Sequence, residues 1–183
     1  MENEATIFIS CIFGRKFNYV HEPPCKKNSY FFTNNKDLKS EIINKGWNYV
    51  YVNKVLTNNY VVSSLQSKYI KFLKFLDDFP EFQNAKTIIY FDHKEIVSSS
   101  TIDEIKLLIN DNLDKSLIIR QEKWTDKTNI YQEFDTAMTQ ERYLTNISIT
   151  KKFVKDLIST NEYSENVIIC NTGLINISLI EKI

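Results

Sequence analysis

The sequence contains few of the residues that shape tight loops around ligands, since three of its 183 residues are glycine and three are proline. It has no G-x-x-x-x-G-K-[ST] phosphate loop, no G-x-G-x-x-G dinucleotide fingerprint and no G-x-S-x-G nucleophile elbow. The patterns H-E-x-x-H and C-x-x-C are missing as well. The chain therefore lacks the signatures of P-loop nucleoside triphosphatases, dinucleotide oxidoreductases, serine hydrolases and zinc enzymes.

An excess of either charge is also missing, because Lys plus Arg and Asp plus Glu both number 23. A balanced chain does not present the general basic surface that suits a polyanion, so we expect no nucleic-acid partner. No apolar run approaches the roughly 18 residues that span a bilayer. A signal peptide has a basic segment before its apolar run, whereas this chain has Glu2 and Glu4 at that place. We expect a cytoplasmic protein without a transmembrane segment.

Cysteine is scarce, and its spacing suits no metal site. Cys11, Cys25 and Cys170 are odd in number and widely separated. Cys11 and Cys170 lie within apolar runs, which predicts buried thiols.

What the sequence does contain is a series of apolar runs that end in polar or charged residues. Between Lys86 and Glu95, the residues Ile88 to Phe91 do not alternate with polar ones, so both faces of this strand should be covered. Such strands are typical of parallel sheets in α/β proteins. Further strands are predicted at Thr6–Phe13, Tyr30–Thr33, Trp47–Val52, Ser116–Arg120 and Val167–Cys170.

Amphipathic patterns fall between these strands and predict helices. The first spans Asp37–Asn44, with Leu38, Ile42 and Ile43 facing inward and Gly46 as its C-terminal cap. The second spans Ser63–Asp78, and its predicted inner face consists of Leu65, Tyr69, Phe72, Leu73 and Leu76.

A third helix is predicted to begin at Thr101, which forms a capping-box pattern with Glu104. Two more helical patterns run from Ile130 to Met138 and from Ile149 to Ile158. Strands and helices thus alternate along the chain. The connection rules then predict an α/β fold: a single domain with a mostly parallel central sheet flanked by helices.

Polar residues at the predicted strand ends are the candidates for chemistry. Asp92 follows the buried run, and ligands of open α/β sheets bind beyond the carboxyl ends of the strands. Asp92 can hold a hard divalent cation, or it can cap a turn. His93 can act as a ligand or acid–base group, or as a structural hydrogen-bonding residue. Arg120, Asn171 and Thr172 end other predicted strands, which implies one shared crevice.

Lys68, Lys71 and Lys74 recur every three residues on the second predicted helix. Such a row is usually a solvated face. This helix leads directly into the strand that ends at Asp92, so one of these lysines could instead reach a diphosphate.

Several segments occur in an order that has a counterpart in a known family. They are Ile12-Phe13-Gly14, Ser29 to Asn34, the lysine-bearing helix, Ile89 to Asp92, Ile118 to Arg120, Ile130 to Glu133, Gln140 to Tyr143 and Asn171 to Leu174. This order resembles the nucleotide-sugar glycosyltransferases of the GT-A fold. It is similar more narrowly to a glycosyltransferase-like group of plants, bacteria and large algal viruses. The resemblance covers roughly residues 5 to 176.

The resemblance implies a single GT-A-like domain over residues 1–183. Such an enzyme moves a sugar from a nucleoside-diphosphate-sugar donor to a glycan or other hydroxyl acceptor, as in polysaccharide biosynthesis. It implies Mn²⁺ or Mg²⁺ at Asp92 and His93, and Glu133 and Asp135 are the candidates for the base that activates the acceptor. The implied donor-binding residues are Phe13, Gly14, Arg15, Thr33, Lys68, Lys71, Asp92, Lys94, Arg120, Asn171 and Thr172.

One departure from the family pattern affects the metal. These enzymes usually carry Asp-x-Asp, whereas here the second Asp is replaced by Lys94. Lys94 either neutralises part of the diphosphate charge or marks a site that has lost metal binding. Two other interpretations stay open. One is a non-catalytic nucleotide- or sugar-binding module. The other is a metal-dependent nuclease or phosphotransferase built around Asp92 and Glu95, which the neutral charge disfavours.

Overall fold

The computed structural model describes residues 6–15, 19–93, 96–112, 117–121 and 170–176, with isolated positions at 139, 144, 148, 151, 152 and 155. The backbone alone is described for 117–121 and 170–176. The chain divides into two compact units, residues 1–119 with 172–183 and residues 120–171. The prediction of a single domain stays a prediction, and the predicted helices after residue 130 lie largely outside the described residues.

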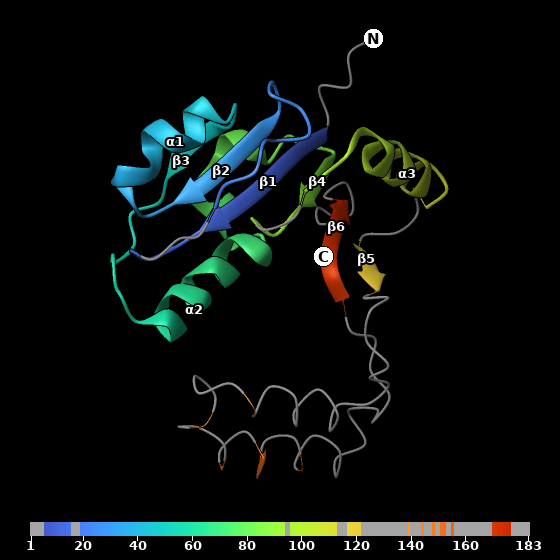
Figure 1. The fold of residues 1–183 in the computed structure, drawn as a ribbon. Coiled ribbons are helices and arrows are strands. Elements are labelled where there is room, and N and C mark those ends of the chain that lie inside the picture. Colours follow the sequence, from blue (N-terminus) through green and yellow to red (C-terminus); the bar gives the residue numbers. More distant parts are fainter. Residues whose placement is uncertain are drawn as a thin grey trace. The chain divides into compact units, whose positions relative to one another are not determined.

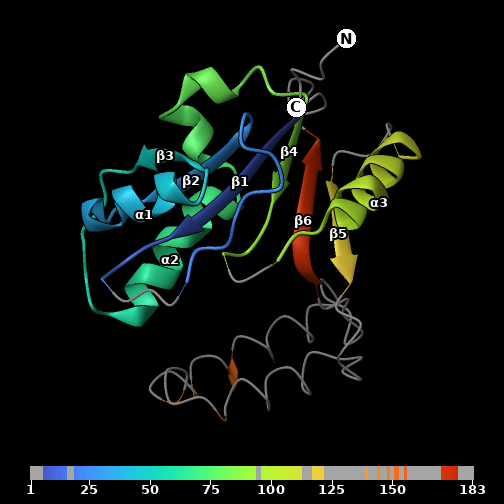
Figure 2. The same ribbon diagram turned by 45° about the horizontal axis from the view of Figure 1, so that its top comes forward.

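The described strands form a sheet in the order β3-β2-β1-β4-β6-β5 (Figure 1). β1 pairs in parallel with β2 and with β4, and β2 pairs in parallel with β3. β6 runs antiparallel to β4, as Figure 2 shows. The prediction of an α/β fold with a mostly parallel sheet is confirmed. The strands are β1 Thr6–Ile12, β2 Ser29–Thr33, β3 Asn48–Tyr51, β4 Thr87–Tyr90, β5 Leu117–Gln121 and β6 Cys170–Asn176.

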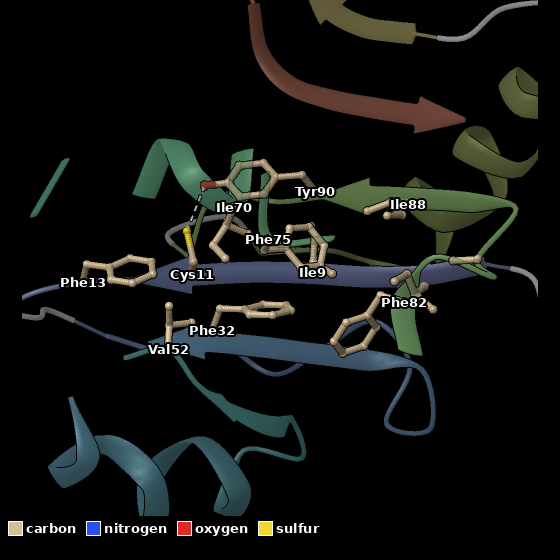
Figure 3. Close-up of a cluster of buried hydrophobic side chains, with 12 residues drawn as sticks. Ile9, Cys11, Phe13, Phe32, Val52, Ile70, Phe75, Phe82, Ile88 and Tyr90 are labelled. Atoms are coloured by element: carbon tan, nitrogen blue, oxygen red, sulfur yellow. Dashed lines mark hydrogen bonds between the residues drawn. The ribbon is translucent and has the colours of Figure 1, made fainter. Parts of the chain in front are cut away.

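Both faces of the parallel strands are buried, as the apolar run before Asp92 predicted. On one face the core beneath α2 (Tyr60–Lys71) includes Ile9, Cys11, Phe32, Ile88 and Tyr90 (Figure 3). The other face carries two smaller clusters, one with Phe31 and Ile42 and one with Phe8, Ile89 and Phe91. Side chains alternate along a strand, so a run without polar residues supplies both faces at once.

The first helical segment matches its prediction in extent. A 3₁₀ turn, η1 Lys36–Leu38, leads into α1 Lys39–Asn44. Gly46 follows with φ of 96°, the left-handed conformation that ends many helices. Leu38 and Ile42 are buried as predicted, but Ile43 is exposed. The prediction for Ile43 was wrong: Leu38 and Ile42, four positions apart, form the inward face, and Ile43 lies to one side of it.

The second helix differs from its prediction at both ends. The Asn59 side chain accepts hydrogen bonds from the N–H groups of Val61 and Val62, so α2 begins at Tyr60. It ends at Lys71, because Leu73 adopts the left-handed conformation with φ of 61°.

This break rotates the chain that follows it. Two 3₁₀ turns, η2 Lys74–Asp77 and η3 Pro80–Phe82, continue from it. Phe75 is thereby placed in the core, whereas Phe72 is 73% exposed and Leu65 is 66% exposed. The predicted inward positions of Leu65 and Phe72 were therefore wrong.

α3 spans Ser99–Asn110, and its cap is Ser98 rather than Thr101. The Ser98 hydroxyl accepts the Thr101 N–H at 3.1 Å, which places Thr101 inside the first turn. Both residues are good N-caps by type, and the one at the extended position before the turn forms the cap. Ile102, Ile105 and Ile109 pack against the sheet beneath α3.

The last strand also differs from its prediction. Asn171 and Thr172 lie within β6 and not beyond its end. Since β6 is antiparallel to β4, with Leu174 opposite Ile89, the start of β6 lies toward the carboxyl end of β4. No helix among the described residues is long and apolar enough to cross a bilayer.

Replacing Phe75 with alanine tests the break in α2. Phe75 is fully buried, with ring centroids 4.8 Å from Phe32 and 5.8 Å from Phe82. We expect the free energy of unfolding to fall by about 3–5 kcal/mol in urea titrations followed by circular dichroism. The matched variant Phe72→Ala should change it by less than about 0.5 kcal/mol. If Phe72→Ala destabilised the protein more than Phe75→Ala, the prediction of one continuous helix would be correct instead.

Candidate functional site

The order of strands places a topological switch point between β1 and β4. After β1, the next two strands of the chain, β2 and β3, extend the sheet on one side of β1. β4 then pairs with the other side of β1. Ligands of open α/β sheets bind at such a point, beyond the carboxyl ends of the strands. Here these ends carry Gly14 and Arg15 after β1, and Asp92 and His93 after β4.

Asp92 is the centre of a small charged cluster. Its carboxylate is 37% exposed, and Oδ2 lies 3.9 Å from Nζ of Lys71 at the end of α2. Oδ1 lies 3.9 Å from Nδ1 of His93. Both distances exceed hydrogen-bond length, so these contacts of Asp92 are electrostatic.

Tyr90 supports this cluster from below. Its hydroxyl donates to Asp92 Oδ1 at 3.5 Å, at the limit for a hydrogen bond, and lies 3.8 Å from Sγ of Cys11 (Figure 3). The Lys71 ammonium lies 5.1 Å from the centre of the Tyr90 ring, within cation–π range. Burial raises the pKa of Tyr90 well above its ordinary value. Tyr90 is therefore a neutral hydrogen-bond donor to the carboxylate.

Cys11 is confirmed as a buried thiol. Burial raises its pKa to about 12, so it stays protonated at neutral pH. A protonated, buried thiol is neither a nucleophile nor a metal ligand. The side chain of Cys170 lies outside the described part of the chain.

Lys68 is the second cation of the site. Desolvation lowers its pKa, and the neighbouring charge of Lys71 lowers it further. Asp92 acts in the opposite direction. Two ammonium groups on one helix thus share a single nearby carboxylate. An anionic ligand that entered between them would relieve their mutual repulsion.

The turn after β1 is held by Asn34. Gly14 has φ of 94° and donates its N–H to Oδ1 of Asn34 at 2.9 Å. The Asn34 amide nitrogen donates to the carbonyl of Val55 at 2.8 Å and to Oε1 of Gln66 at 3.1 Å. A Cβ at position 14 would lie 2.3 Å from the Ser63 hydroxyl oxygen. Glycine is required here by both its conformation and the close approach of α2.

The other residues predicted to bind a donor have different surroundings. Phe13 is buried in the core, and the buried Thr33 hydroxyl accepts the N–H of Asn35 at 3.1 Å. Both residues are almost completely buried, so neither is accessible to a ligand in this structure. Arg15 is exposed at the switch point, and its N–H donates to the carbonyl of Thr57 at 3.1 Å.

The remaining predicted site residues are described in part or not at all. Arg120 lies in β5 and Asn171 and Thr172 lie in β6, with their backbone alone described. Lys94, Glu133 and Asp135 lie outside the described residues. Their predicted roles stay predictions.

The geometry can be tested for its fit to Mn²⁺ or Mg²⁺. Among the described residues, no group of three or more His, Cys, Asp or Glu side chains could hold a metal ion. Within the described part of the chain, the Asp92 carboxylate accepts one long hydrogen bond from Tyr90, and its contacts with Lys71 and His93 are longer than hydrogen bonds, so it has lone pairs left for a cation. Judged by these described side chains, the site fits a hard cation only when phosphate oxygens of a ligand complete the coordination shell.

A separate cavity of about 370 Å³ lies at the opposite, amino edge of the strands. Its lining includes Ile7, Tyr30, Val50, Phe82 and Ala85. The Asn48 amide on its wall already donates to three backbone carbonyls. This cavity carries none of the predicted site residues.

The structure thus brings together Lys68, Lys71, Asp92 and His93 from α2 and the end of β4. Tyr90 was not predicted as a site residue because it forms part of the apolar run. The signal that could have indicated it is its hydroxyl, the polar group within that run. No family model, curated protein or solved structure matches the chain.

Asn34→Ala tests how the switch-point turn is held. The variant leaves the Gly14 N–H without its acceptor and removes the three bonds that the Asn34 amide nitrogen donates to Lys54, Val55 and Gln66. We expect the free energy of unfolding to fall by about 1–3 kcal/mol, the cost of unsatisfied buried polar groups. Asn84→Ala, at an exposed asparagine, is the matched control. Equal stability of the two variants in urea titrations would show that the Asn34 bonds do not hold the turn.

Proposed function

We propose that this chain is a glycosyltransferase that uses a nucleoside-diphosphate-sugar donor and a hydroxyl acceptor. The observation that carries the proposal is the pair of lysines beside one half-exposed carboxylate at the switch point of the sheet. The order of segments that resembles the GT-A glycosyltransferases also supports it. The parallel strands β3, β2, β1 and β4 are consistent with that fold.

The lysines suit the leaving group of such a transfer. When the bond between the sugar C1 and the diphosphate oxygen breaks, the diphosphate gains negative charge that must be stabilised. Lys71 lies between the Asp92 carboxylate and the Tyr90 ring, and Lys68 is partly desolvated nearby. Charged hydrogen bonds to phosphate are strongest where water is partly excluded. We assign Lys71 and Lys68 to the diphosphate.

Asp92 is assigned to the metal and the diphosphate, with His93 beside it. Bound there together with the donor, Mn²⁺ or Mg²⁺ would supply further positive charge to the diphosphate. Without the donor, Asp92 pairs loosely with Lys71, so donor and metal should bind cooperatively. Lys94 contributes additional charge in this proposal.

The acceptor side requires a base. The acceptor hydroxyl attacks C1, and its proton passes to a carboxylate near the new bond. Glu133 and Asp135 remain the candidates for this role.

A second candidate function is a non-catalytic nucleotide- or sugar-binding module. The observation that favours it is Lys94 in place of the second aspartate of the family pattern. The same lysines would bind the diphosphate in both cases. Release of free nucleoside diphosphate from a nucleotide sugar, in the presence of glycan acceptors, distinguishes the transferase from the module.

Lys71→Ala tests the assignment of the diphosphate site. Nucleoside diphosphates of uridine, guanosine, adenosine and cytidine are titrated calorimetrically against both proteins. For the one that binds, we expect the variant to bind roughly ten- to a hundredfold more weakly, since one charged hydrogen bond is lost. The melting temperature without ligand should stay near that of the parent, because partly exposed ion pairs add little stability.

Lys74→Ala is the matched control for Lys71. Lys74 lies one turn further along, is 72% exposed and pairs with Asp77. Its loss should leave nucleotide affinity unchanged. If the parent, Lys71→Ala and Lys74→Ala bound the nucleotide equally well, Lys71 would be interpreted as part of a solvated helix face. Failure of all four nucleotides to bind would reject the proposed function itself.

Asp92→Asn separates a ligand carboxylate from a turn cap. Asparagine still accepts hydrogen bonds but carries no charge for a cation. If Asp92 is a ligand, Mn²⁺ should strengthen nucleotide binding by the parent protein. In the presence of Mn²⁺, the variant should then bind the nucleotide about tenfold or more weakly than the parent. Stability should remain near that of the parent. Affinity that depends neither on Mn²⁺ nor on the substitution would remove Asp92 from the site.

A further inference from the structure

The outward face of α2 is apolar. Val61, Leu65 and Phe72 recur at helical spacing on one side of the helix, opposite the fully buried Ile70. All three are exposed, and we call them the α2 stripe. Val55, in the loop before the helix, is 74% exposed. Aligned apolar side chains on an exposed helix face mark an interaction surface more often than scattered ones do.

The chain around the α2 stripe is entirely basic among its charged residues. No Asp or Glu occurs between Glu41 and Asp77, whereas the same segment holds five lysines. The whole chain has zero net charge, so this local excess is balanced elsewhere.

Two of these lysines lie beside the α2 stripe, Lys54 in the loop before α2 and Lys68 on the helix itself. The Lys54 ammonium lies 4.4 Å from the Tyr69 ring centre, and the Lys68 ammonium lies 5.9 Å from that of Phe72. The ion pairs of the described residues include Lys71 and Lys74 but neither Lys54 nor Lys68. Positive charge therefore flanks the apolar stripe.

The exposed face of α3 has the opposite charge. Leu107 is 63% exposed there, yet Asp103, Glu104 and Asp111 surround its position on the helix. Apolar exposure alone is thus common to both helices. α2 differs from α3 because its exposed apolar side chains lie beside lysines that form no ion pair with the described carboxylates.

We propose that the α2 stripe, with Lys54 and Lys68, docks α2 onto an anionic lipid surface with the helix axis in the plane of the interface. A bilayer offers an apolar phase for Val61, Leu65 and Phe72 and negative headgroups for the lysines. A nucleic acid would match the charge but offers no apolar phase for the aliphatic side chains. Lys68 also belongs to the proposed diphosphate site, so the charge is tested at Lys54, which that site does not include. Loss of the proposed transferase function would leave this inference standing.

Co-sedimentation with vesicles tests the proposal on the full chain. Vesicles of equimolar phosphatidylserine and phosphatidylcholine are compared with phosphatidylcholine alone, at low and at high salt. We expect binding to the anionic vesicles that salt weakens. The double variant Leu65→Asn/Phe72→Asn should lower the partition coefficient by about tenfold or more. Lys54→Gln should lower it about fivefold.

Matched controls come from the region of α3. Ile96→Asn/Leu107→Asn removes similar exposed apolar area, and Lys106→Gln removes one exposed lysine, so neither should change binding. Circular dichroism verifies that each variant is folded.

Equal binding to both vesicle types, or no effect of the α2 variants, overturns the proposal. The proposal is also overturned if the protein binds short DNA and Lys54→Gln weakens that binding to the same extent. A dimer that Leu65→Asn/Phe72→Asn dissociates, without vesicle binding, also overturns it by identifying a second copy as the occupant.

Discussion

The amide side chain of Asn34, at the end of β2, joins the segments that build the candidate site. Its oxygen holds the Gly14 turn after β1, and its nitrogen reaches the carbonyl of Val55 and the side chain of Gln66 on α2. The Gln66 amide donates to the same Val55 carbonyl at 2.9 Å. These bonds tie α2 and the loop before it to the carboxyl ends of β1 and β2. Since Lys68 and Lys71 belong to α2, these bonds help to position the charge at the switch point, together with the packing of Ile70 in the core.

The charges of the site follow from burial as much as from contact. Tyr90 and Cys11 are buried beneath Asp92 and stay neutral, so they add hydrogen-bonding capacity but no charge. The cluster then contains two ammonium groups and one carboxylate among the described residues, with His93 beside them. A net positive, partly desolvated cluster of this kind attracts an oxyanion and disfavours a lone divalent cation. That balance is why we assign the metal a role only together with a diphosphate.

The parts of the fold that sequence patterns could predict are those where local signals agree. The run Ile88 to Phe91 predicted a doubly covered strand, and Gly46 predicted the end of α1, because each signal has one structural interpretation. α2 was predicted less well. Its apolar residues at positions 65, 69, 72, 73 and 76 fit one helical face, but the left-handed Leu73 breaks the helix and places Phe75 in the core. A periodic pattern cannot register such a break, since the residue in the left-handed conformation is an ordinary leucine.

The sequence by itself determined the alternation of strands and helices, the buried strand before Asp92, and the presence of a carboxylate, a histidine and lysines in one region of the chain. Those features follow from periodicity and from neighbours along the chain. Only the tertiary structure decided the order of the strands, the antiparallel direction of β6, and which lysine approaches Asp92. Hydrogen bonds between distant segments made those decisions: β1 pairs with residues more than 70 positions away in β4, and Asn34 reaches Gln66 over 32 positions. Such pairing depends on how well whole surfaces pack, and local sequence does not encode it.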